Sequence, residues 1–137
     1  MLGKITWNYH AQLQVLIAED DEANQFYLQT LLKRADMTVH LASNGKEAVD
    51  IIRNLPDIHL VLMDIRMPVM DGIEATRQIK SFRKELPVIA VTAYAMTGDE
   101  RKAREAGCDE YLTKPLSKNL LFEKILKYLT KNSIPSN

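Results

Sequence analysis

Four groups of reactive side chains stand at the ends of short apolar segments of this chain. They are the pair Glu19 and Asp20, Asp64, Thr92, and Lys114. A few carboxylates open to water suit Mg²⁺ better than Zn²⁺, which prefers nitrogen and sulfur ligands. A divalent ion and an ammonium group can share the charge of an incoming phosphoryl group, and a carboxylate can accept it as an acyl phosphate. These residue types therefore indicate phosphoryl chemistry.

Each group also has an ordinary structural explanation when it is taken alone. An acidic run such as Glu19–Glu22 is often solvated surface, or a helix start that the helix dipole favours. Asp64 can form a turn, Thr92 can be a β-branched strand residue, and Lys114 can point into solvent. The functional interpretation depends on their shared placement, because all four groups follow or end apolar segments in a consistent order.

The apolar segments predict five strands. The runs LQVLIA (Leu13–Ala18), LVLM (Leu60–Met63) and VIAVTA (Val88–Ala93) suit strands that are buried on both faces of a parallel sheet. TVHLA (Thr38–Ala42) alternates more and predicts a strand nearer an edge, and EYLT (Glu110–Thr113) predicts a short fifth strand.

Helical spacing of apolar residues fills the intervals between these strands. It runs over Tyr27–Ala35, Ala48–Leu55, Ile73–Ile79, Ala103–Ala106 and Leu121–Leu129. Pro56 is a stop signal, Gly107 a C-cap and Ser117 an N-cap. Alternating strands and helices predict an α/β fold whose parallel sheet carries helices on both faces.

The ligand site of such a sheet lies beyond the carboxyl ends of its strands, where the strand order reverses. If the first and third strands are neighbours, Glu19, Asp20 and Asp64 converge there. Their mutual repulsion is costly unless a cation lies among them.

Composition limits the class of protein. A chain of 137 residues is one domain, and 18 basic against 18 acidic residues give no support to nucleic-acid binding. The single cysteine, Cys108, excludes an internal disulfide framework and fits a reducing compartment. No apolar run approaches the roughly 18 residues of a membrane span, and MLGKITWNYH lacks a signal-peptide core. We therefore expect a cytoplasmic domain without membrane or nucleic-acid contact.

Specific motifs then point to a family. With VIAVTA they are VLIAEDDEANQ at 15–25, LVLMDIRMPVMDG at 60–72 and YLTKP at 111–115. Over about residues 14–131 the chain resembles the receiver domain of two-component response regulators. The resemblance implies a flavodoxin-like (CheY-like) three-layer sandwich, with a five-stranded parallel sheet of order 2-1-3-4-5 and five helices. It divides the chain into an N-terminal extension or linker (1–12), the receiver domain (13–131) and a C-terminal tail or linker (132–137).

The resemblance also implies the metal site and the acceptor. Asp64 would take a phosphoryl group from a phosphohistidine of a partner. Asp20, Asp64 and the backbone carbonyl of Arg66 would bind Mg²⁺ (or Mn²⁺), and Glu19 would act mainly through a coordinated water. Phosphorylation and dephosphorylation would be self-catalysed, and the chain would not be an enzyme in the usual sense.

Further positions take their roles from the same resemblance. Lys114, the hydroxyl of Thr92 and the backbone N–H of Ala93 would contact the phosphoryl oxygens. The bond between Lys114 and Pro115 would be cis, as such bonds belong to proline.

Phosphorylation would also switch the conformation. Thr92 would move toward the phosphoryl group and Tyr111 would turn inward, which changes the face made by the fourth helix, fifth strand and fifth helix. Arg66 and Tyr94 would tune how fast water removes the phosphoryl group, since a bulky Tyr94 can shield it.

Two other functions compete with this interpretation. A phosphatase of the haloacid-dehalogenase type also uses an Asp nucleophile with Mg²⁺, but it needs a second acid two residues later, where this chain has Arg66. A degenerate receiver that is never phosphorylated usually lacks the acceptor or the lysine, and both Asp64 and Lys114 are present.

The partners follow from the family as well. A histidine kinase or a histidine phosphotransfer domain would donate the phosphoryl group, and an output protein or a second copy would dock on the switching face. Asn24 resembles receivers of hybrid histidine kinases. The domain therefore stands alone, begins a longer regulator or belongs to a hybrid kinase.

Overall fold

Five βα units follow one another along the chain. The computed structural model describes residues 13–93 and 98–132. The strands are β1 (Gln14–Ala18), β2 (Thr38–Ala42), β3 (Leu60–Asp64), β4 (Val88–Thr92) and β5 (Glu110–Thr113). The helices are α1 (Glu22–Arg34), α2 (Gly45–Asn54), α3 (Gly72–Phe82), α4 (Asp99–Ala106) and α5 (Lys118–Asn132).

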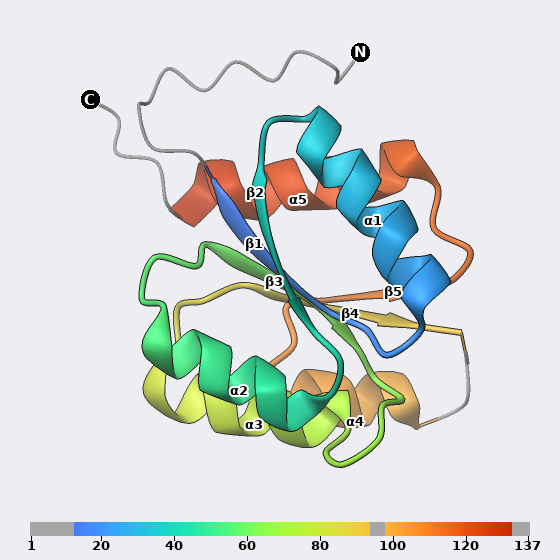
Figure 1. Ribbon diagram of the computed structural model, residues 1–137. Coiled ribbons are helices and arrows are strands. Elements are labelled where there is room, and N and C mark those ends of the chain that lie inside the picture. Colours follow the sequence, from blue (N-terminus) through green and yellow to red (C-terminus); the bar gives the residue numbers. More distant parts are fainter. Residues whose placement is uncertain (1–12, 94–97, 133–137) are drawn as a thin grey trace.

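The strands form one parallel sheet of order β2-β1-β3-β4-β5, as the family resemblance implies (Figure 1). The chain reverses direction across the sheet between β1 and β3, which are neighbours with Ala18 opposite Met63. Because Glu19 follows Ala18 and Asp64 follows Met63, this register brings the acidic residues of both strands to the same edge.

Strand ends differ from the predicted ones by a residue. Leu13 and Ala93 lie just outside β1 and β4, and Asp64 is the last residue of β3. Asp64 belongs to the strand because its backbone pairs with Val91 of β4. Hydrophobicity does not show where backbone pairing stops, so the apolar pattern predicted a strand that ended at Met63, one residue before Asp64.

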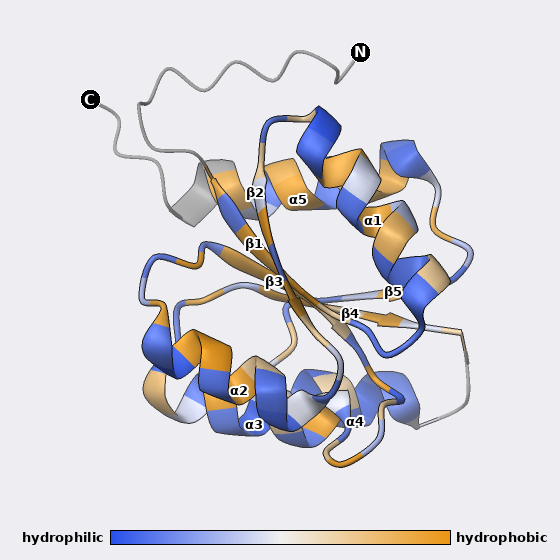
Figure 2. Ribbon diagram, viewed as in Figure 1, coloured by the Kyte–Doolittle hydropathy of each residue, from blue (hydrophilic) through white to orange (hydrophobic). Residues whose placement is uncertain are grey.

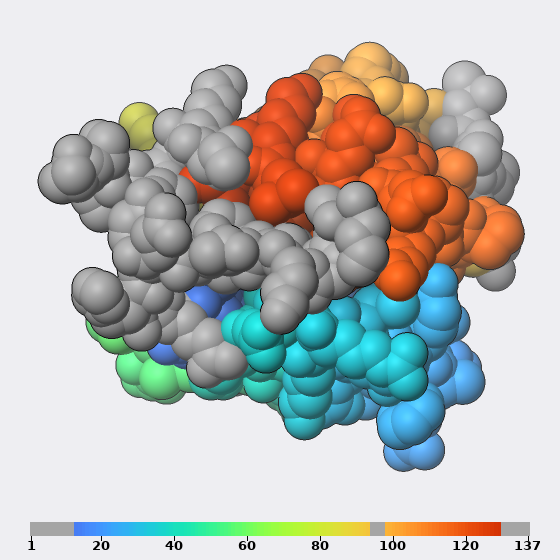
Figure 3. All heavy atoms as spheres, turned by 90° about the horizontal axis from the view of Figure 1, so that it is seen from above, coloured from blue at the N-terminus to red at the C-terminus, as the bar shows by residue number. Residues whose placement is uncertain are grey.

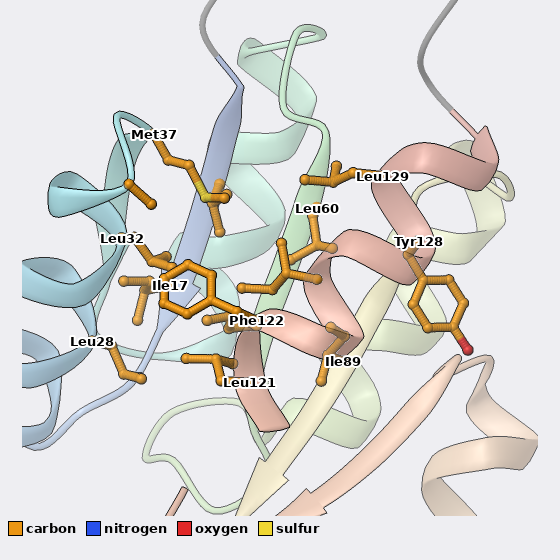
Figure 4. Packing of buried hydrophobic residues seen from close by; sticks show 14 of the residues in the cluster. Ile17, Leu28, Leu32, Met37, Leu60, Ile89, Leu121, Phe122, Tyr128 and Leu129 are labelled. Atoms are coloured by element: carbon orange, nitrogen blue, oxygen red, sulfur yellow. The ribbon is translucent and has the colours of Figure 1, made fainter. Parts of the chain in front are cut away.

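Helices cover both faces of the sheet, and each face has its own apolar core. In Figure 2 the central strands are largely hydrophobic, whereas the helices alternate between hydrophobic and hydrophilic residues. Helices α1 and α5 lie side by side on one face, as Figure 3 shows from above. The core beneath them includes Ile17, Leu32, Leu60, Ile89 and Phe122 (Figure 4). Burial of each such side chain contributes about 1.5–3 kcal/mol.

The other face is covered by α2, α3 and α4. Its core includes Leu16, Ile52, Val61, Ile79 and Val88. Ser117 precedes α5 as its N-cap and Gly107 follows α4 as its C-cap, as predicted. The Leu120 N–H donates to Ser117 Oγ at 3.0 Å, and Gly107 closes α4 with a φ of 115°.

Aspartate and asparagine side chains start three helices next to the acidic edge. Asp21, Asn44 and Asp71 each accept a hydrogen bond from the backbone N–H three residues later. Such a cap stabilises a helix by about 1 kcal/mol. Asp21 thus has a structural task, which separates it from its neighbours Glu19 and Asp20.

Over residues 13–93 and 98–132, no helix is both long enough and apolar enough to cross a membrane.

Candidate functional site

Three carboxylates converge at the carboxyl ends of β1 and β3. Glu19, Asp20 and Asp64 each offer an oxygen, and these oxygens lie within 4.8 Å of one another. Glu19 and Asp64 are buried, with 3% and 6% of their surfaces exposed, while Asp20 is open to solvent. A small set of hard oxygen donors, partly open to water, fits Mg²⁺.

Close backbone approaches fix the loop that follows Asp64. The Gly72 N–H donates to the Ile65 carbonyl at 2.8 Å, and a Cβ at Gly72 would lie 2.1 Å from the Asp64 carbonyl oxygen. Only glycine therefore lets α3 begin so close to the end of β3. The Gly45 N–H holds the same loop by donating to the Met70 carbonyl at 2.9 Å.

Lys114 comes into the cluster from the far end of the chain. Its Nζ donates to Glu19 Oε1 at 2.7 Å and lies 3.6 Å from Asp64 Oδ2. Its backbone N–H donates to the Thr92 carbonyl at 2.8 Å, and its peptide bond to Pro115 is cis. Burial disfavours the ammonium charge, but the hydrogen bond to Glu19 and the Asp64 carboxylate outweigh it and raise the pKa of Lys114.

The negative charge of the Asp64 carboxylate is less well neutralised by its surroundings. Burial and the nearby Glu19 carboxylate raise its pKa to about 6, against the opposing effects of Lys114 and of the Arg66 N–H, which donates to Asp64 Oδ1 at 3.2 Å. Three carboxylates thus share one ammonium group here, and a bound divalent cation would supply the missing positive charge.

The excess of negative charge in this cluster predicts that Asp64→Asn stabilises the metal-free protein. The pKa of Asp64 is higher in the folded than in the unfolded chain, so ionisation lowers stability as pH rises through about 6, and the effect fades toward pH 4. In EDTA at pH 7.5 we expect the variant to melt roughly 3–8 °C higher than the wild type, and the difference to shrink at pH 5. Thermal unfolding followed by circular dichroism measures both; an equal or larger difference at pH 5 would contradict the assignment of the effect to ionisation.

The other predicted positions that the structure describes lie on or directly after β4 and on β5. Thr92 is fully buried at the end of β4, beside the strand that carries Asp64, and Ala93 follows it at the surface. Tyr111 is partly buried on β5, and burial together with Asp99 raises the pKa of its phenol. Tyr94 lies outside the described residues.

The sequence analysis missed two residues that touch the site from other elements. Asp99, at the start of α4, pairs with the Arg66 guanidinium at 2.9 Å. On α1, Gln25 donates its side-chain N–H to the Glu19 carbonyl and also reaches Ser43 Oγ at 3.4 Å. No spacing rule singles out either residue, because each contact joins a helix to a loop that it meets only in the folded chain.

Comparison with protein families matches residues 15–126 to the response regulator receiver domain. A hybrid signal transduction histidine kinase I of Dictyostelium discoideum is 39% identical over 131 residues, which are 87% of this chain and 8% of that protein. The polar-differentiation response regulator DivK of Brucella anthropi is 41% identical over 118 residues, which are 84% of this chain and 94% of DivK. The chain therefore spans a small part of the first relative and nearly all of the second.

Solved structures agree with the fold and the metal. The receiver domain of a Pseudomonas aeruginosa sensor histidine kinase, with a magnesium ion coordinated in its active-site cleft, has a TM-score of 0.82 and 32% identity, and the match covers 88% of this chain and 99% of that one. The receiver domain of Ssk1 from Saccharomyces cerevisiae, crystallised with the histidine phosphotransfer protein Ypd1, has a TM-score of 0.83 and 35% identity, with 91% and 94% covered.

Proposed function

Because the chain belongs to the response regulator receiver family, we propose that its Asp64 accepts a phosphoryl group from a phosphohistidine of a partner protein. Receiver domains are phosphoacceptor modules of two-component signalling with an acidic Mg²⁺ site, and they are not classical enzymes. The observation that carries the proposal is the placement of Asp64. It lies buried between Lys114, 3.6 Å away, and the carboxylates of Glu19 and Asp20.

Four residues would hold the metal. The carboxylates of Asp20 and Asp64 and the backbone carbonyl of Arg66 would bind Mg²⁺ (or Mn²⁺), and Glu19 would act through a water. Mg²⁺ would neutralise charge on the phosphoryl oxygens during transfer. The buried, hydrogen-bonded position of Glu19 fits this indirect role, because Lys114 already occupies one of its oxygens.

The chain itself would position the phosphoryl group. An Asp64 oxygen forms the new bond to phosphorus as the bond from phosphorus to the partner's imidazole breaks. Lys114 would bind a phosphoryl oxygen as a flexible point charge, and the Thr92 hydroxyl and Ala93 N–H would bind the others. Arg66 and Tyr94 would tune how fast water later attacks the acyl phosphate.

The conformational response would start at β4 and β5. Thr92 moves toward the phosphoryl group, and Tyr111 turns inward and changes the face formed by α4, β5 and α5. This face would bind an output protein or a second copy of the chain.

Receiver domains bind phosphotransfer proteins such as Ypd1 and partners such as CheX. For this chain we infer that a histidine kinase or a histidine phosphotransfer domain donates the phosphoryl group. We also infer that the domain is cytoplasmic and contacts neither nucleic acid nor membrane. Residues 1–12 and 132–137 would flank the receiver domain (13–131) as linker or tail. The match to a Dictyostelium hybrid kinase favours a longer hybrid kinase as the parent protein, and the match to DivK favours a stand-alone regulator.

Acetyl phosphate tests the proposed function without a partner. With Mg²⁺ we expect intact-mass analysis to show one phosphoryl adduct per chain, and none when EDTA is added. Steady turnover of small phosphate esters would favour the phosphatase instead. A protein that binds Mg²⁺ yet forms no adduct would be a degenerate receiver, and the proposal would be wrong.

A further inference from the structure

One ion pair joins the loop after β3 to the start of α4. Arg66 Nη2 lies 2.9 Å from Asp99 Oδ2, and the side chain of Asp99 is only 15% exposed, against 52% for that of Arg66. The acid is thus largely enclosed, whereas the guanidinium reaches it from the solvent side. Hydrogen bonds between ionised partners are the strong ones in proteins.

Arg66 is linked to the acceptor, and Asp99 lies near a residue that is proposed to switch. The backbone N–H of Arg66 donates to Asp64 Oδ1 at 3.2 Å, so the guanidinium belongs to a residue already bound to the acceptor. Asp99 is the first residue of α4 and lies close enough to Tyr111 to affect its pKa. The pair therefore spans from the acceptor to the elements proposed to switch.

Within the described residues, helix α4 packs on the domain through small side chains. Its buried residues are Ala103 and Ala106, and Figure 2 shows it largely hydrophilic. Gly98, which precedes it with a φ of 97°, provides no side-chain cap. Because two buried alanines contribute little apolar area, an ion pair at the first turn adds to what fixes the start of α4.

The guanidinium also has room to leave Asp99. A hollow of about 450 Å³ lies beside the pair, bounded in part by Ile65, Asp71 and Lys102. The exposed Arg66 side chain can move within this hollow without exposing either apolar core to water.

We propose that Asp99 is a positioning residue that acts through Arg66. In the unmodified protein it holds the guanidinium on α4, and it competes for this guanidinium with the phosphoryl group on Asp64. An acyl phosphate carries close to two negative charges and Arg binds phosphate and carboxylate alike, so phosphorylation draws Arg66 away and loosens the start of α4. The inference rests on the proposed function of Asp64.

Beryllofluoride, which mimics a phosphoryl group on an aspartate, tests this competition. Removal of the competitor in Asp99→Asn should tighten beryllofluoride binding in excess Mg²⁺ by about two- to fivefold, the range that a partly exposed ion pair supports. Isothermal titration of the whole chain measures the affinity. An unchanged or weaker affinity overturns the inference.

Two further variants distinguish positioning from simple support of the helix. Glu100→Gln removes the next acid of the same helix turn, whose partner is Arg104 within α4 at 3.1 Å, and should leave the affinity unchanged. In an Arg66→Gln background, Asp99→Asn should have no effect, because the competing guanidinium is gone. An equal gain in that background, or an equal gain from Glu100→Gln, would show that Asp99 acts only on the helix.

The amide NMR resonances of α4 provide an independent measurement. In Asp99→Asn without beryllofluoride, the amide resonances of Glu100–Lys102 should move part of the way toward their positions in the wild-type complex, as a population shift requires. Wild-type positions in the variant would contradict the inference. If the wild type itself binds no beryllofluoride, the proposed function fails with it, and this result is distinct from binding that the variants leave unaltered.

Discussion

Replacement of Asp64 by asparagine should abolish the phosphoryl adduct formed with acetyl phosphate and Mg²⁺. An amide cannot form an acyl phosphate, and it removes one of the three converging carboxylates. Asp20 and Glu19 remain, but Asp20 is solvent-exposed and Glu19 is engaged by Lys114 at 2.7 Å, so neither replaces the acceptor. We expect a loss of more than about 100-fold in initial rate by intact-mass analysis, because the variant lacks the nucleophile itself.

Asp21→Asn is the matched control. It makes the same chemical change two residues from Glu19, at a side chain that caps α1 by accepting from the Asn24 N–H at 2.9 Å. Asparagine caps helices about as well as aspartate, so this variant should fold and form the adduct at the wild-type rate. An adduct that persists in Asp64→Asn would move the acceptor to another carboxylate and refute the assignment.

Lys114→Met should slow phosphorylation but strengthen binding of Mg²⁺. Methionine keeps an unbranched side chain and removes the only ammonium group that the described residues place in the acidic cluster. Loss of one such charge opposite a transferring group costs on the order of 100-fold in rate. The same ammonium group competes with a cation for Glu19 and Asp64, so its removal should tighten Mg²⁺ binding several-fold.

The opposite signs of the two effects make this test specific. Adduct formation at saturating Mg²⁺ gives the rate, and isothermal titration gives the Mg²⁺ affinity. Lys118→Met, at the exposed start of α5, removes an equal charge and should change neither quantity. If Lys114→Met lowered the rate and the Mg²⁺ affinity together, the side chain would support the fold of the site rather than act on the phosphoryl group.

The sequence predicted the fold well because its signals are local. Apolar runs such as Val88–Ala93 and helical repeats such as that of α1 identify the elements, and the βα alternation then leaves few possible topologies. Helix caps are equally local signals: Ser117 caps the start of α5 and Gly107 the end of α4, as expected. The predicted strand ends differ from the observed ones by a residue, because the pairing of Asp64 with Val91 depends on a neighbouring strand.

Part of the candidate site was also predictable from local signals. Residues at strand ends can be found by counting along the chain, and the resemblance to a family supplied their roles. Asp21 shows the limit of counting, because it stands in the same acidic run as Glu19 and Asp20 but caps α1 instead.

By itself the sequence determined which elements form, in which order, and which side chains stand at the carboxyl ends of the strands. Only the tertiary structure decided how these side chains share charge: that Lys114 lies against Glu19 and near Asp64, and that Arg66 turns to Asp99. The reason is that Coulomb energies and desolvation depend on distance and burial in three dimensions, which spacing along the chain does not encode.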